Sequence, residues 1–258
     1  MALIIGGHPR SGTTLMAKLC NRHPEIGVTI EFHNFMALNS SYWDHLRTIR
    51  KNWYVRGMVR NAGRGAPWRA RLYSARFLAL YTLGLLQYAN RPIGVAEIER
   101  VLHRLFPRAK LVGDKFPRYV FRLDTLVAEP ALKRVIIYRD ARDVVSSMLV
   151  KLRGPWQHME VAREMDSVGK IAQAWVRSIE AMEKHRTHLH AIRYEDLVGN
   201  PREQLDALAS FLEVDPTGFR DEIVRDTSIG KFRKGLTSEE IAQTCEVAGP
   251  TLARLHYI

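Results

Sequence analysis

The first fifteen residues constrain the fold more than any other part of the chain. Apolar residues 2–5 predict a buried strand, the residues that follow a glycine-rich turn, and Thr13 the start of a helix. Such a turn directs several backbone N–H groups at one point, which also carries the positive end of the helix dipole. We therefore predict an anion-binding loop suited to a phosphate group.

The segment from Gly7 to Gly12 has the glycine spacing of a nucleotide-binding P-loop, with one departure. Thr13 stands where ATP-binding loops carry lysine, and the basic residue lies inside the loop as Arg10. The pattern indicates phosphate binding of a kind that differs from an ATPase. A simpler alternative is that Thr13 only caps a helix, because threonine is a good N-cap residue.

A second segment, residues 134–147, repeats the order of strand, turn and helix. Arg139 ends the predicted strand 133–139, at the edge where parallel sheets place their ligands. Ser147 follows on the first turns of the predicted helix. An arginine fork and a hydroxyl can bind a second phosphate, so the two segments predict a ligand with two separated phosphate groups.

The remaining pattern predicts an α/β fold with a parallel sheet and helices on both faces. Further strands are expected at 27–32, 110–116 and 190–194, between helical patterns such as 95–105 and 168–182. Capping-box patterns predict two helix starts, after Asn200 and at Thr237. We expect one domain over 1–258.

Residues 40–96 are predicted to form a basic, largely helical insertion. From His45 to Ala96 the chain has nine arginines, one lysine and no acidic residue, whereas the net charge of the whole chain is +12. The aromatic residues among these charges are Trp53, Tyr54, Trp68, Tyr73, Phe77 and Tyr81. The insertion is either a surface for an anionic partner, such as an acidic acceptor or a membrane surface contacted through 45–96, or a set of solvated helices. Nucleic acid is the less expected partner.

The sequence favours a soluble, cytoplasmic protein. The first expected strand begins at Ala2 and leaves no room for a signal peptide. The longest apolar run, 77–89, is too short to span a bilayer. Cys20 and Cys245 lie far apart and suggest no disulfide framework.

Taken together, these segments resemble the sulfotransferases that use 3′-phosphoadenosine 5′-phosphosulfate (PAPS), in particular the branch with tyrosylprotein and many bacterial carbohydrate and small-molecule sulfotransferases. Residues 9–15 resemble the loop that binds the 5′-phosphosulfate, and Arg139 with Ser147 resembles the 3′-phosphate site. Residues 114–117 (Asp-Lys-Phe-Pro) resemble the lysine-containing turn of the family. The stretch 193–201 resembles its Tyr-Glu-Asp-Leu segment.

The resemblance implies PAPS as co-substrate, without a metal, and a set of residues that bind it. These are Arg10, Ser11, Gly12, Thr13, Thr14, Arg139, Ser147, Tyr194, Ser228 and Lys231. Two positions depart from the cytosolic small-molecule branch of the family, which usually carries lysine where Arg10 stands and tryptophan near Phe232. The acceptor is expected to bear a hydroxyl, on a glycan, a glycolipid, a tyrosine or a small metabolite.

Sulfonate transfer also requires catalytic groups. Arg10 and Lys115 are expected to stabilise the leaving phosphate, and the resemblance implies Glu31 as the general base. His33 is the alternative base, because in an extended chain it projects to the same side as Glu31. In a third interpretation Glu31 forms a simple ion pair with Arg10.

Three other functions fit the sequence less well. A P-loop kinase or NTPase needs a lysine at the position of Thr13. A basic membrane- or nucleic-acid-binding protein without catalysis would use only the insertion. A dinucleotide-dependent oxidoreductase is poorly supported, because no Gly-x-Gly-x-x-Gly motif follows the first strand.

Overall fold

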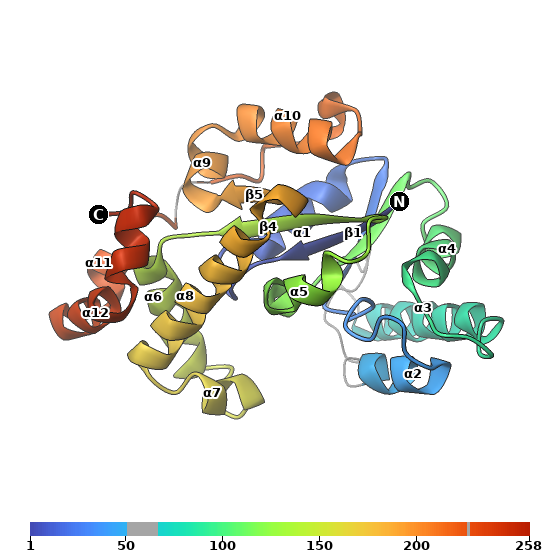
Figure 1. The fold of residues 1–258 in the computed structure, drawn as a ribbon, viewed down its shortest axis with the longest axis horizontal. Coiled ribbons are helices and arrows are strands. Elements are labelled where there is room, and N and C mark those ends of the chain that lie inside the picture. Colours follow the sequence, from blue (N-terminus) through green and yellow to red (C-terminus); the bar gives the residue numbers. More distant parts are fainter. Residues whose placement is uncertain (51–66, 226–227) are drawn as a thin grey trace.

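The structure is a computed structural model that describes residues 1–50, 67–225 and 228–258. Its centre is a five-stranded sheet in which every neighbouring pair is parallel. The strands lie in the order β2-β3-β1-β4-β5 (Figure 1). Their bounds are β1 Ala2–Gly6, β2 Ile26–Ile30, β3 Leu111–Lys115, β4 Leu132–Tyr138 and β5 His190–Arg193. The predicted α/β class is confirmed.

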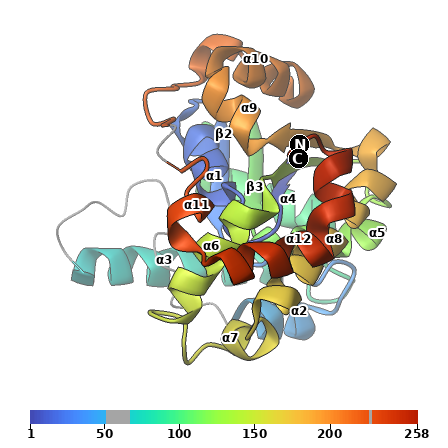
Figure 2. The ribbon, with the colours of Figure 1, turned by 90° about the vertical axis from the view of Figure 1, so that its left-hand side faces the viewer.

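Alternating apolar side chains of the strands bury both faces of the sheet. Leu3 and Ile5 of β1 pack in one core cluster, whereas Ala2 and Ile4 pack in another. On the first face lie α1 (Thr13–Arg22), α9 (Tyr194–Gly199) and α10 (Pro201–Leu212). Figure 2 shows α9 and α10 on one side of the sheet and α2, α3, α7 and α12 on the other.

The second face is covered in two parts. At the β2–β3 end of the sheet pack α2 (Tyr42–Arg50), α3 (Pro67–Leu86) and α4 (Val95–Leu105). At the β4 end pack α6 (Ala141–Leu152), α8 (Val168–Lys184) and α12 (Ser238–Arg254), around the buried Trp175. Shorter helices are α5 (Leu123–Leu126), α7 (Glu160–Glu164) and α11 (Phe232–Gly235), with the 3₁₀ helices η1 (Pro117–Arg122), η2 (Arg186–His188) and η3 (Pro216–Gly218).

Helix starts follow the sequence closely, with one correction. The capping box at Thr237 is present: its side chain accepts from the Glu240 N–H, and Glu240 accepts from the Thr237 N–H. At Asn200 the helix begins as predicted, but the side chain makes no capping hydrogen bond. Pro201, with φ already restricted to helical values, suffices to start α10.

The described part of the basic insertion is largely helical, with turns at residues 87–90. Phe77, Tyr81 and Leu85 of α3 are buried against α4 and the sheet, while Leu80 and Leu83 are exposed. Trp53 and Tyr54 lie outside the described residues, as do the side chains of Trp68 and Tyr73. Among the described helices, none is both long and apolar enough to cross a bilayer.

Candidate active site

The loop after β1 has the strained backbone expected of an anion-binding turn. Gly7 has φ 144° and donates its N–H to the Pro117 carbonyl at 3.1 Å. A Cβ at Gly7 would lie 2.1 Å from the Ile137 carbonyl oxygen, so no other residue fits this position. Arg10, at φ 75°, lies inside the loop in the left-handed region. The backbone therefore turns sharply enough to aim the following N–H groups at one point.

Helix α1 begins directly from this loop. Its N-cap is Gly12, at φ 102° and without a side-chain cap, so the alternative in which Thr13 caps the helix is wrong. The first N–H groups of a helix have no acceptor within it, and its dipole favours an anion there. Among the described residues, Ser11 Oγ and His8 Nε2 are buried in this loop without a hydrogen-bond partner. These atoms leave hydrogen-bonding capacity for a ligand.

The second predicted anion site follows β4. Arg139 is buried, its guanidinium pairs with Asp143 at 3.0 Å, and it lies over the Tyr194 ring at 4.8 Å. The Trp175 indole N–H donates to the Arg139 carbonyl at 2.9 Å. Arg139 Nε is buried without a partner among the residues that the structure describes. The side chain is thus fixed from several directions while one of its donors stays unused.

The two sites meet at Ser147. Arg10 Nε donates to Ser147 Oγ at 2.9 Å, and Arg139 Nη1 donates to the Arg10 carbonyl at 3.4 Å. Burial lowers the pKa of Arg10, and the Arg139 charge lowers it further. Two guanidinium groups therefore lie close enough to repel each other beside the N-terminus of α1. An anion between them would relieve that repulsion.

Residues 228–231, which precede α11 and are called the C-terminal loop here, reach this site through their backbone. The Ser228 carbonyl accepts a hydrogen bond from Arg139 Nη2. Asp143 Oδ1 and Oδ2 accept from the backbone N–H groups of Phe232 and Gly230 at 2.9 and 2.8 Å. Lys231 precedes α11, and its exposed side chain makes no hydrogen bond or ion pair with described residues. The structure thus brings Ser228 to the site, but not the Lys231 side chain.

Lys115 and Glu31, two of the predicted catalytic residues, lie on the β3 side of the phosphate loop, whereas Arg139 lies on its β4 side. Lys115, at the end of β3, is 1% exposed, and its Nζ lies 2.6 Å from Glu31 Oε1 and 3.4 Å from Thr14 Oγ1. Glu31 therefore pairs with Lys115, and the interpretation that pairs it with Arg10 is wrong. The Glu31 side chain is 47% exposed, so its carboxylate can also meet a second molecule.

Glu31 and His33 do not continue the strand, contrary to the prediction of an extended segment to residue 32. Strand β2 ends at Ile30, and the two residues have φ 58° and 66°, in the left-handed region. The argument that an extended chain directs both side chains to one side is therefore wrong. The His33 ring lies against the Phe116 ring, tilted by 34° with 3.8 Å between the centroids, and burial lowers the pKa of His33 to about 4.

Asp114 fixes the turn at residues 31–33 through hydrogen bonds, although the sequence did not identify it as a functional residue. Its buried carboxylate accepts from the Phe32 and His33 N–H groups at 3.1 and 2.9 Å, and from Thr29 Oγ1 and Tyr119 OH at 2.7 and 2.6 Å. Burial raises the pKa of Asp114, and the four hydrogen bonds oppose that rise. An acidic residue inside the apolar strand 111–115 was the available signal, because a buried carboxylate must be satisfied by several donors.

The family model described as "Sulfotransferase family" matches residues 2–218. A sequence search of curated proteins finds no match. Among solved structures, a sulfotransferase from Mycobacterium avium aligns with a TM-score of 0.57 at 14% identity, covering 98% of this chain and 76% of that one.

Two further structures share the fold. The sulfotransferase domain of the olefin synthase from Synechococcus aligns with a TM-score of 0.53 at 19% identity, over 95% of this chain and 86% of that domain. A mouse sulfotransferase in complex with PAP aligns with a TM-score of 0.50 at 13% identity, over 98% of this chain and 84% of that one. Since the family model spans the phosphate loop, both arginine-bearing segments and all five strands, the chain belongs to the sulfotransferase family.

Proposed function

We propose that this protein transfers the sulfonate group of PAPS to a hydroxyl acceptor by in-line displacement. The observation that carries the proposal is that Arg10, beside the N-terminus of α1, contacts both Ser147 and Arg139. Two guanidinium groups next to a phosphate loop suit a nucleotide with two phosphate groups. The mouse structure that shares this fold was determined with such a nucleotide, PAP.

The two phosphate groups would be bound by different parts of the site. Ser11, Gly12, Thr13 and Thr14 at the start of α1, with Lys115, would bind the 5′-phosphosulfate. Arg139, Ser147 and the Ser228 backbone would bind the 3′-phosphate. The Arg10 side chain lies nearer the latter, so it would serve that phosphate at least as much as the leaving group. Tyr194, which supports Arg139, completes the nucleotide site.

The reaction would proceed with Glu31 as the base. The acceptor oxygen forms a bond to sulfur as the bond between sulfur and the 5′-phosphate oxygen breaks, and the leaving bisphosphate keeps the electron pair. Glu31 accepts the hydroxyl proton, while Lys115 and the loop N–H groups stabilise the charge that develops on the phosphate. Lys115 contacts both Thr14 of the loop and Glu31, so one cation would stabilise the leaving phosphate and also hold the base in place.

Residues 40–96 are proposed to border the acceptor site only at the β2–β3 end of the sheet, where α2 and α3 pack, and, through α3, to contact a membrane surface. The supporting observation is that Leu80, Leu83 and Leu86 are exposed on a helix in the most basic part of the chain. Binding to vesicles with and without anionic lipid tests this part of the proposal separately.

Binding of adenosine 3′,5′-bisphosphate, measured by calorimetry, tests the nucleotide assignment. The bisphosphate should bind tighter than ATP with magnesium, and Arg139→Gln should weaken it roughly 10- to 100-fold, the loss expected for one charge-assisted contact. The matched control is Arg153→Gln, an exposed arginine just after α6 that pairs with Glu240. It should leave the affinity within about twofold. Unchanged binding by Arg139→Gln, or tighter binding of ATP, would show that the assignment is wrong.

A further inference from the structure

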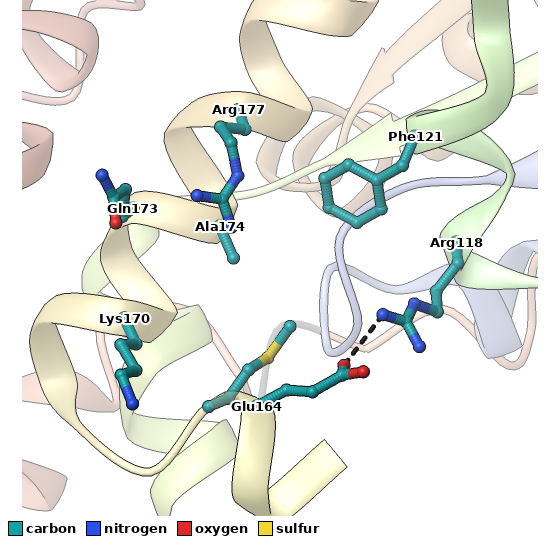
Figure 3. Close-up of a pocket in the computed structure, with 8 residues that line it drawn as sticks. Arg118, Phe121, Glu164, Lys170, Gln173, Ala174 and Arg177 are labelled. Atoms are coloured by element: carbon teal, nitrogen blue, oxygen red, sulfur yellow. Dashed lines mark hydrogen bonds and ion pairs between the residues drawn. The ribbon is translucent and has the colours of Figure 1, made fainter. Parts of the chain in front are cut away.

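A cavity of about 580 Å³ opens between η1, α7 and α8 (Figure 3). Three of its lining side chains are cations, Arg118, Lys170 and Arg177, and one is a carboxylate, Glu164. Phe121 and Met165 add apolar surface. The cavity therefore combines an excess of positive charge with a wall on which a ring or an alkyl group can pack.

The three cations differ in how they are paired. Arg118 pairs with Glu164 at 2.8 Å, and Lys170 pairs with Asp166 at 2.8 Å. Arg177 has no hydrogen-bond or ion-pair partner among the described residues. Figure 3 shows its side chain on the α8 side of the cavity and Phe121 on the η1 side. Arg177 is thus the cation available to a ligand.

The cavity adjoins the proposed transfer site. Arg118 follows Pro117, whose carbonyl accepts the Gly7 N–H of the phosphate loop at 3.1 Å, and lies three residues after Lys115. Besides burial, the charges of Glu31, Arg118 and Lys115 all act on the pKa of His33. The Arg177 charge likewise acts on the pKa of His8, in the phosphate loop. Because η1 begins two residues after Lys115 and accepts the Gly7 N–H at Pro117, the η1 wall of the cavity adjoins both the phosphate loop and the Lys115–Glu31 pair.

We propose that this cavity binds the acceptor and selects one that carries an anionic group, a carboxylate or a sulfate, attached to an apolar or ring portion. The inference rests on the proposed function. Arg177 would bind the anionic group, and Phe121 would pack against the ring, which places the hydroxyl toward Glu31. Arg118 would contribute after release from Glu164, so Arg177 is the residue on which selection mainly depends.

Matched acceptor pairs test the proposal on the full chain loaded with adenosine 3′,5′-bisphosphate. The pairs are 4-ethylphenol with 3-(4-hydroxyphenyl)propanoate, and the latter with 2-(4-hydroxyphenyl)ethyl sulfate, which keeps the phenol hydroxyl and whose binding distinguishes sulfate from carboxylate. Binding is measured by calorimetry, and transfer from labelled PAPS is measured in parallel. The wild-type protein should bind the anionic compounds at least fivefold tighter than 4-ethylphenol, and Arg177→Gln should remove that preference without weakening 4-ethylphenol.

The control is Arg108→Gln, which removes the same charge from an exposed arginine in the turn between α4 and β3. It should keep the preference. Equal binding of neutral and anionic compounds by the wild-type protein, or an unchanged preference in Arg177→Gln, would overturn the inference. Failure of the proposed function looks different, because then the bisphosphate itself would not bind.

Discussion

The most informative contact at the residue scale is the ion pair between Lys115 and Glu31. A lysine that is 1% exposed is costly unless an anion is near, and Glu31 supplies one at 2.6 Å. The partner is half-exposed, so only the lysine is committed to the interior. This difference in exposure fits the proposed roles, in which Lys115 stays fixed in the interior and Glu31 contacts the acceptor.

Glu31→Gln should retain the shape of the site but remove the base. Transfer from PAPS should fall roughly 10²- to 10⁴-fold, the usual contribution of general base catalysis. Affinity for adenosine 3′,5′-bisphosphate should change by no more than a few-fold. The two are measured by labelled transfer and by calorimetry. His33→Gln is the matched comparison, and it should reduce transfer far less. Wild-type turnover in Glu31→Gln would instead assign the base to His33 or to water.

At the scale of elements, two buried carboxylates organise the loops at the carboxyl edge of the sheet. Asp114 binds the turn that carries Glu31, and Asp143 binds both Arg139 and the backbone of the C-terminal loop. Each satisfies backbone N–H groups that a loop could not otherwise bury. The functional side chains are therefore held by residues that need not touch a substrate.

Gly7→Ala tests whether the phosphate loop needs its observed backbone. The added methyl group would lie 2.1 Å from the Ile137 carbonyl, at a φ that alanine rarely adopts, so unfolding free energy should fall by about 3 kcal/mol or more. Bisphosphate binding should be lost as well. Gly169→Ala is the control: nothing lies within 4 Å of its added methyl, and it should stabilise α8 by up to about 1 kcal/mol. Denaturant unfolding measures both. Wild-type stability and binding in Gly7→Ala would contradict the loop geometry.

The sequence predicted the elements of this site better than its contacts. The strand and helix around each phosphate segment follow from local periodicity, so β1, α1, β4 and α6 lie where expected. The hydrogen bond from Arg10 to Ser147 joins residues 137 positions apart and follows only from sheet order. The left-handed turn that begins at Glu31 had no signal there either, because glutamate rarely adopts a positive φ. Tertiary contacts through Asp114 impose it.

At the scale of the whole molecule, the parallel sheet brings three distant segments to one edge. Arg10 lies in the loop after β1, Lys115 is the last residue of β3, and Arg139 directly follows β4. Because neighbouring strands run in one direction, their carboxyl ends converge, and the positive charge of the site is a consequence of topology. The interior of the protein also contains His8 and His45, and His33 is partly buried.

Stability should decrease in acid because of these histidines. Burial lowers the pKa of His8, His33 and His45 to about 4, below the value of about 6.5 in an unfolded chain. Between pH 6.5 and 4 the unfolded state binds more protons, so the free energy of unfolding falls as pH falls through this window and is constant above it. His45→Gln should remove about 2 kcal/mol of the loss between pH 7 and pH 5. Denaturant unfolding at the two pH values measures this, and an equal loss in the variant would contradict it.

The most direct test of the account is a crystal structure with adenosine 3′,5′-bisphosphate. We expect the 5′-phosphate within hydrogen-bonding distance of the backbone at Gly12–Thr14 and of Lys115 Nζ. The 3′-phosphate should contact the Arg139 guanidinium and Ser147 Oγ, between the two arginines that now approach each other. A bisphosphate bound elsewhere, or with either phosphate away from these groups, would contradict the central claim.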